Sequence, residues 1–226
     1  MFFDPRFFLV VGPFMLLAFF ASMRVKSTFK RYAKVGVRSG MTGAEAARAV
    51  ARAGGAEVTV ERVGGFLSDH YDPRTKTLRL SPEVHDGRSI SAIAVGAHEA
   101  GHAIQDVQQY AWLGMRSSLV PMTMMGSRSW IWIFIAGMLL QQPALAWVGV
   151  ILFSFTVIFQ LVTLPVEFDA SKRAKAVLAE AGIVSSAEEQ KGVSDVLGAA
   201  AMTYVAGALT AIATLFYYVT LLSGRD

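Results

Sequence analysis

The sequence contains no cysteine and little charge. Without cysteine the chain forms no disulfide bonds, and any metal site must use histidine and carboxylate ligands. Charged residues make up 17% of the 226 residues against 54% hydrophobic ones, and the mean hydropathy is +0.45. This balance is too apolar for an ordinary soluble domain and indicates a membrane protein.

Acidic residues are fewer than basic ones, which leaves a net charge of +4. The basic residues are unevenly spread, and six of them follow the first apolar stretch: Arg24, Lys26, Lys30, Arg31, Lys34 and Arg38. Positive charge at the edge of an apolar segment determines membrane topology. We therefore expect a lipid bilayer as the environment and no nucleic-acid partner.

Long uncharged stretches predict the membrane segments. Segment 1–23 has no charge after Arg6, and because basic residues follow it, we interpret it as a retained transmembrane anchor rather than a signal peptide. Segment 119–164 is expected to form a transmembrane helical hairpin, although Arg128 is costly in its first leg unless it faces protein or reaches the interface. Segment 196–226 is expected to hold the last transmembrane helix and a short tail.

Two polar segments separate these stretches. In segment 24–118 we expect a helix opened by a capping box at Thr42, a β-hairpin within 58–81 and a helix over 89–109. Pro165 is expected to end the membrane hairpin, so that segment 165–195 forms separate polar helices. The excess of Lys and Arg beside both polar segments predicts that they face the cytoplasm.

The predicted fold is therefore a mainly α membrane protein. It has about four transmembrane helices and a small cytoplasmic α+β domain, which carries a short β-hairpin.

The run His98-Glu99-Ala100-Gly101-His102 carries the most specific chemical signal. Residues four apart share one face of a helix, so His98 and His102 can bind a single Zn²⁺ ion. Glu99 can then act as general base towards a water molecule at that ion. Two histidines at this spacing also occur on helices that bind no metal. Because the residues that flank this motif are apolar or small and none of them breaks the helix, the pattern predicts a zinc hydrolase and favours a peptidase. The cytoplasmic α+β domain is then expected to be a catalytic domain of the zincin type.

Two histidines leave zinc short of ligands, and Glu167 is the best candidate for the third. An antiparallel membrane hairpin returns the chain close to the helix that carries the motif, and Glu167 follows directly. Asp169 is a weaker choice because it points nearly opposite on a helix. Glu167 could also serve only as an acidic residue at a helix N-terminus.

Other contributions to catalysis stay open in the sequence. Four polar side chains are candidates to stabilise an oxyanion, and each has a simpler structural interpretation: His70, Tyr71, Arg173 and Tyr204. A strand of the 58–81 hairpin could pair with an extended substrate backbone, or could belong to an ordinary sheet.

Three segments resemble the YugP-type membrane zinc metallopeptidases of bacteria: His98–Gln105, Leu164–Ser171 and Asp69–Ser81. That group is similar to gluzincin membrane proteases of the HtpX type, whose third ligand is a Glu from a later helix. The resemblance implies a zinc peptidase of the bacterial inner membrane, with protein or peptide substrates and a role in membrane-protein quality control.

The chain departs from this pattern at one position. HtpX-type proteases typically have Asp four residues after the Glu ligand, where this chain has Ser171. Asp106 or Asp169 are then the alternatives for the carboxylate partner of a ligand histidine.

Other functions compete with this interpretation. A site-2-type intramembrane protease buries its motif in a membrane helix, but Gln105, Asp106 and Gln108 make this helix too polar. The FtsH proteases share the motif but carry an ATPase domain, and no P-loop is present. A non-catalytic membrane scaffold or regulator that binds structural zinc would not need Glu99.

Overall fold

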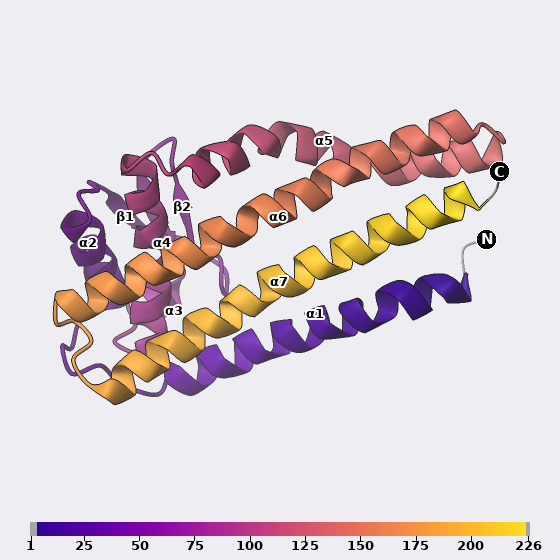
Figure 1. The fold of residues 1–226 in the computed structure, drawn as a ribbon. Coiled ribbons are helices and arrows are strands. Elements are labelled where there is room, and N and C mark those ends of the chain that lie inside the picture. Colours follow the sequence, from indigo (N-terminus) through magenta and orange to yellow (C-terminus); the bar gives the residue numbers. More distant parts are fainter. Residues whose placement is uncertain (1–3, 225–226) are drawn as a thin grey trace. The chain divides into compact units, whose positions relative to one another are not determined.

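The computed structural model describes residues 4–224 and is mostly helical (Figure 1). Its elements, in chain order, are α1 (Pro5–Tyr32), α2 (Gly43–Ala53), β1 (Thr59–Arg62), β2 (His70–Asp72), β3 (Thr77–Leu80), α3 (Pro82–His85), α4 (Ile90–Val107), α5 (Ala111–Leu139), α6 (Pro143–Glu180) and α7 (Ala187–Ser223).

Contacts divide the chain into two units. One comprises the residues up to Ala21, Gly114–Leu164 and the residues from Thr203 onward, and we call it the apolar unit. The other comprises Ser22–Leu113 and Pro165–Met202, and we call it the polar unit.

Three of the described helices are long and apolar enough to cross a membrane by length and composition, namely α1, α6 and α7. Helix α5 is not one of them, and it carries Arg116 and Arg128. The expectation of a mainly helical chain with helices of membrane length is confirmed, whereas four spans stay a prediction.

Two expected boundaries are wrong. Pro165 does not end the membrane hairpin, because α6 continues through it from Pro143 to Glu180. Val166 and Ala170 just beyond it are fully buried, and such packing can hold a helix through the loss of one backbone hydrogen bond. The end of the expected polar segment 165–195 and the last membrane segment likewise share one helix, α7, because a change from polar to apolar side chains does not interrupt backbone hydrogen bonding.

Helices α2 and α4 form the centre of the polar unit. The capping box is present as expected: the Thr42 hydroxyl accepts from the Glu45 backbone N–H, and the Glu45 carboxylate accepts from the Thr42 backbone N–H. The two helices touch closely, since a Cβ on Gly96 would lie 2.6 Å from the carbonyl oxygen of Gly43. Ser89 caps the start of α4, close to the predicted beginning of the helix that carries the motif.

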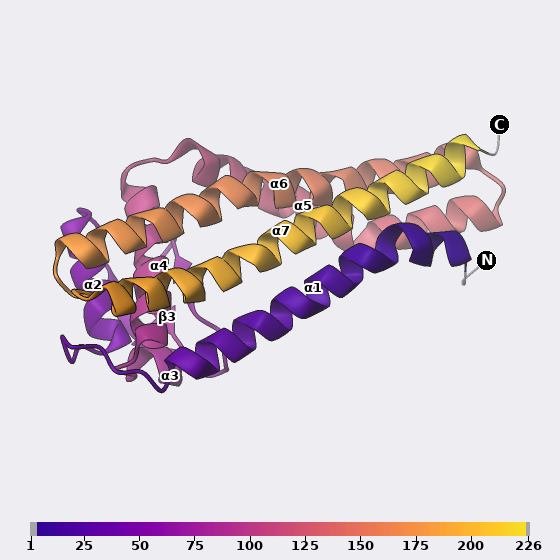
Figure 2. The same ribbon diagram turned by 60° about the horizontal axis from the view of Figure 1, so that its bottom comes forward.

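A three-stranded sheet in the order β1-β3-β2 completes this unit. The predicted hairpin is present as the antiparallel pair β2–β3, whereas β1 pairs parallel to β3. Within the expected 58–81 segment, β2 begins only at His70, because Gly65 (φ 112°) and Leu67 (φ 55°) adopt backbone conformations that a strand does not contain. Figure 2 shows β3 beside α4, and Leu78 on β3 is fully buried.

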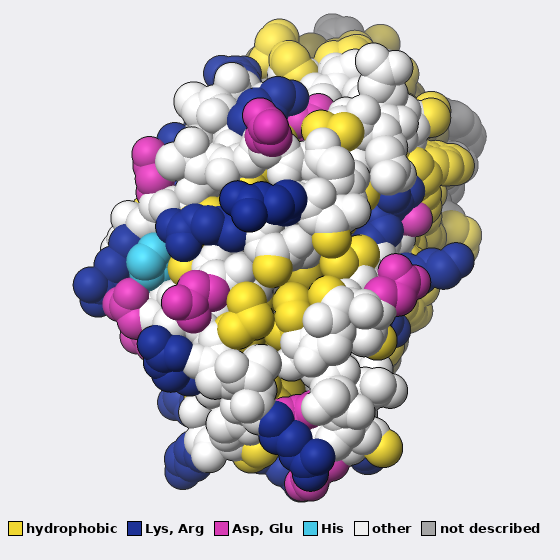
Figure 3. Space-filling view, turned by 90° about the vertical axis from the view of Figure 1, so that its left-hand side faces the viewer, with side chains coloured by type: hydrophobic (Ala, Val, Ile, Leu, Met, Phe, Trp, Pro, Cys, Tyr) yellow, Lys and Arg dark blue, Asp and Glu magenta, His cyan; other side chains and the backbone are white. Residues whose placement is uncertain are grey.

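The two units differ in their surfaces. One face of the polar unit carries Lys and Arg interspersed with Asp and Glu around a small hydrophobic area (Figure 3). The apolar unit instead exposes large apolar side chains, such as Met125 and Trp132, each 71% exposed. Such a surface suits lipid better than water.

Candidate metal centre

The polar unit brings together the three metal ligands that the sequence suggests. Helix α4 presents His98 and His102 on one face, and α6 presents Glu167. The His98 Nε2 atom lies 3.1 Å from Glu167 Oε2, and the His102 Nε2 atom lies 3.6 Å from the same oxygen. One ligand atom from each of the three residues lies within 4.8 Å of the other two.

This convergence depends on Gly101, an unspecified position of the motif. A Cβ at Gly101 would lie 2.5 Å from the carbonyl oxygen of Ala170 on α6, closer than two such atoms can approach. Glycine within a helix costs about 1 kcal/mol relative to alanine. The close contact that it permits allows α6 to hold Glu167 against the two histidines.

The donor set suits zinc. Two imidazole nitrogens and one carboxylate are a ligand set of catalytic zinc sites, which keep a fourth position open. Tetrahedral zinc with bonds of about 2.0–2.1 Å separates its ligand atoms by roughly 3.3 Å. The distances from Glu167 Oε2 to the two Nε2 atoms, 3.1 and 3.6 Å, lie on either side of this value. The Glu167 side chain is 3% exposed, and a buried carboxylate needs a compensating positive charge.

The second ring nitrogen of each candidate ligand, His98 and His102, has its own polar partner. The Ser171 hydroxyl oxygen lies 3.1 Å from His98 Nδ1, and the Gln105 side-chain oxygen lies 3.0 Å from His102 Nδ1. Sequence reasoning missed both partners. A signal was available for Gln105, because a residue three positions after His102 shares its helical face.

The two carboxylates suggested for this role contact other groups. Asp106 accepts hydrogen bonds from the Tyr71 hydroxyl at 2.6 Å and the Lys76 ammonium at 2.5 Å. Asp169 accepts from Arg173 and from the side chain of Gln105. Asp169 therefore reaches His102 only through the Gln105 amide, and the prediction of a direct carboxylate partner is wrong.

Electrostatics at His102 favours a bound cation. Burial by itself lowers the pKa of His102, but the hydrogen bond to Glu167 and the charge of Glu99 outweigh it, so that the pKa is raised. A metal ion needs the neutral imidazole and must displace this proton. The same negative charges that hold the proton also attract a metal cation.

Glu99 lies next to His98 on α4 and is 8% exposed. Its charge influences Asp69, a residue just before β2 that sequence reasoning did not single out. The pKa of Asp69 is raised, mainly by burial and further by Glu99. Ser81 holds Asp69 in place through its backbone N–H at 2.7 Å.

The structure does not select an oxyanion-stabilising residue. Tyr71 and Arg173 donate to the carboxylates of Asp106 and Asp169, respectively. The remaining two candidates differ in setting: His70 is exposed on β2, and Tyr204 belongs to the apolar unit. These four assignments stay predictions.

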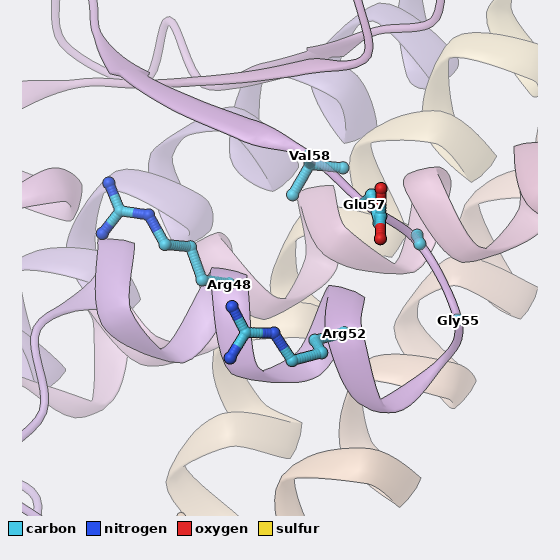
Figure 4. Close-up of a pocket in the computed structure, with 6 residues that line it drawn as sticks. Arg48, Arg52, Gly55, Glu57 and Val58 are labelled. Carbon is cyan, nitrogen blue, oxygen red and sulfur yellow. The ribbon is translucent and has the colours of Figure 1, made fainter.

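An open hollow of about 450 Å³ lies elsewhere in the polar unit (Figure 4). It is formed by the end of α2 and the segment that leads into β1, and it is lined by Arg48, Arg52, Gly55, Ala56, Glu57 and Val58. None of these is a candidate site residue, so we do not connect this hollow with the metal centre.

Comparisons with known proteins agree with the chemistry of the centre. A family model described as "Putative neutral zinc metallopeptidase" matches residues 7–223. A relative from Bacillus subtilis (strain 168), named "Putative membrane protease YugP", is 48% identical over 212 residues, which cover 93% of this chain and 94% of the relative. No solved structure gives a significant match. The chain therefore belongs to the neutral zinc metallopeptidase family.

Proposed function

We propose that this protein is a zinc-dependent membrane peptidase that hydrolyses peptide bonds with Glu99 as general base. The convergence of His98, His102 and Glu167 within the polar unit is the observation that supports this most strongly. Membership of the family and the name of the relative support it independently.

In this proposal the three convergent side chains hold the ion, and Glu99 moves protons. Bound zinc supplies Lewis acidity, which polarises a carbonyl group and makes water a stronger acid. Glu99 takes the proton of the attacking water and passes it to the leaving amine. A structural zinc site would need the three ligands but would not need Glu99.

The substrate in this proposal is an extended stretch of protein or peptide. Strand β2 is an edge of the sheet, and it follows Asp69, whose pKa responds to Glu99. An edge strand offers free backbone groups to an extended chain and binds it with little regard to sequence. This mode of binding suits a protease that removes damaged membrane proteins.

We also propose how the chain sits in the bacterial inner membrane. Helices α1, α6 and α7 cross it together with the apolar part of α5, which gives four spans. Segments 24–118 and 165–195 then face the cytoplasm, because Lys and Arg concentrate beside them. The alternative of a site-2-type intramembrane protease is less well supported, since α4 is not one of the described helices that are apolar enough to cross a membrane.

The first test is the zinc content of the detergent-purified protein. We expect about one zinc per chain in the wild type and in Glu99→Gln, and a sharply weakened site in Glu167→Ala. Glu180→Ala, an exposed glutamate on the same helix α6, is the matched control and should retain zinc. Full zinc retention in Glu167→Ala would exclude Glu167 as a ligand.

The second part of the test is peptide hydrolysis. Glu99→Gln should abolish hydrolysis while it keeps its zinc, because the amide cannot accept the proton of water. Unchanged function in this zinc-loaded variant would favour the other candidate, a non-catalytic zinc-binding scaffold or regulator.

A further inference from the structure

We propose that Gln105 is a positioning residue that selects which ring nitrogen of His102 faces the metal and that ties α4 to α6 beside Glu167. This inference rests on the proposed function, because it assigns His102 as a zinc ligand. It concerns a neutral amide at a position where zinc enzymes more often place a carboxylate or a backbone carbonyl.

The Gln105 side chain is completely buried and has three polar neighbours. Its side-chain oxygen lies 3.0 Å from His102 Nδ1. Its side-chain nitrogen donates to the carbonyl oxygen of Val166 at 2.8 Å and to the carboxylate of Asp169 at 2.9 Å. One amide therefore links a ligand on α4 to the residue that precedes Glu167 on α6.

These neighbours determine the orientation of the amide. A carbonyl oxygen and a carboxylate only accept hydrogen bonds, so the NH₂ group of Gln105 must face Val166 and Asp169. The amide oxygen must then face His102. Because that oxygen only accepts, Nδ1 of His102 carries the hydrogen, and the lone pair of Nε2 is directed toward the metal site.

His98 lacks this constraint. Its Nδ1 faces the hydroxyl of Ser171, which can either donate or accept. Ser171 therefore accommodates both tautomers of His98, whereas Gln105 permits only one neutral tautomer of His102. Gln105 therefore fixes the tautomer of His102, whereas Ser171 does not fix the tautomer of His98.

Arg173 holds Asp169, one of the two acceptors of the Gln105 amide. Arg173 donates to Asp169 and, through another guanidinium nitrogen, to the side-chain oxygen of Gln108. Gln108 caps α4 and Arg173 lies on α6, so the chain of contacts returns to the helix on which it began. This closed path holds Asp169 in place as an acceptor for Gln105.

The experiment measures the zinc affinity of the detergent-purified full chain by competition with a chelator. Gln105→Met preserves the length of the side chain and removes its hydrogen bonds. We expect zinc affinity to fall about 10- to 100-fold, as for other partners of metal-bound histidines. Gln190→Met makes the same chemical change at an exposed position of α7 and should leave affinity unchanged.

A rescue experiment separates positioning from a general packing defect. Gln105→Glu alone should also weaken zinc binding, because it places a second carboxylate against Asp169 and the Val166 carbonyl. Adding Asp169→Asn should recover most of the affinity, since the new amide can donate to the new carboxylate, which still accepts from His102 Nδ1. The visible spectrum of the Co²⁺-loaded protein should change in Gln105→Glu and return toward wild type in the double variant.

The possible outcomes distinguish a failure of the role of Gln105 from a failure of the proposed peptidase function. Zinc affinity within about threefold of wild type in Gln105→Met, well below the usual loss, would overturn the positioning role and leave the proposed function standing. A double variant no better than Gln105→Glu would also overturn it. A wild-type protein that takes up no zinc would overturn the proposed function, and this inference with it.

Discussion

In each of the two units, a glycine allows two helices to approach closely, but the side chains around the two contacts differ. In the apolar unit, a Cβ on Gly149 of α6 would lie 2.8 Å from the carbonyl oxygen of Trp130 on α5. In the polar unit, a Cβ on Gly101 of α4 would lie 2.5 Å from the carbonyl oxygen of Ala170 on α6. Both glycines permit backbones to touch.

The difference lies in the side chains around each contact. Around Gly149 they are apolar and aromatic, and Trp130 packs against Phe153 with ring centroids 4.5 Å apart. Around Gly101 they are polar and buried, with His102 and Gln105 held by specific hydrogen bonds. Loss of close packing should therefore cost only stability in the apolar unit, but ligand geometry as well in the polar unit.

The proposed membrane topology predicts that segments on opposite sides of the membrane differ completely in their labelling by an impermeant reagent. The chain lacks cysteine, so single cysteines report their own accessibility without background. In right-side-out membrane vesicles, Gln142→Cys should react with a membrane-impermeant thiol reagent, and Glu188→Cys should react only after permeabilisation. The opposite pattern would reverse the proposed orientation.

Gly101→Ala should have the largest effect on the metal centre. The added methyl group pushes α4 away from α6, and we expect zinc affinity to fall by at least about 100-fold, the upper end for loss of a supporting contact. Gly198→Ala is the control on α7 of the same unit, because its Cβ would meet no atom within 4 Å. Equal zinc affinity in both variants would contradict the role of Gly101.

Gly149→Ala should break the packing of the apolar unit and leave zinc affinity unchanged. The new methyl group overpacks the contact with α5, at a cost of about 1–3 kcal/mol, measured as a lower unfolding temperature in detergent. Gly114→Ala on α5 has open space and serves as control. A loss of zinc affinity in Gly149→Ala would show that the two kinds of contact are not separable.

The smallest effect concerns the sheet of the polar unit. The hydrogen bond from Arg79 lowers the pKa of Asp72 to about 2, below its value in an unfolded chain. The pair therefore stabilises the fold above about pH 4, the unfolded value, and this contribution is lost as pH falls toward 2. Asp72→Asn should be less stable than wild type at pH 7, and the difference should shrink in acid.

Thermal unfolding at several pH values checks this expectation. Glu180→Gln, at an exposed position that ends α6, provides the comparison and should not differ from wild type at any pH. A stability difference for Asp72→Asn that stays constant down to pH 2 would rule out the carboxylate charge as its cause.

Local patterns were enough to predict several elements. The capping box at Thr42 and the expected hairpin, which turns after Asp72, depend on hydrogen bonds between near neighbours in the chain, and both are present. The prediction that a helix ends at Pro165 was wrong because it considered only the backbone hydrogen bond that proline removes. The packing of Val166 and Ala170, which are fully buried, comes from distant segments. The partner of His98 was missed for the same reason, because Ser171 lies 73 positions from it along the chain.

The sequence by itself determined the candidate zinc motif, because His98 and His102 are spaced by about one turn of a helix. It also determined the candidate membrane segments, since hydropathy is a local sum. Only the tertiary structure decided that Glu167 meets both histidines, that Gly101 must lack a side chain and that Gln105 donates to the carbonyl oxygen of Val166. These contacts join α4 to α6 across more than sixty residues, and no local propensity specifies which backbone or side chain will fill the space between two packed helices.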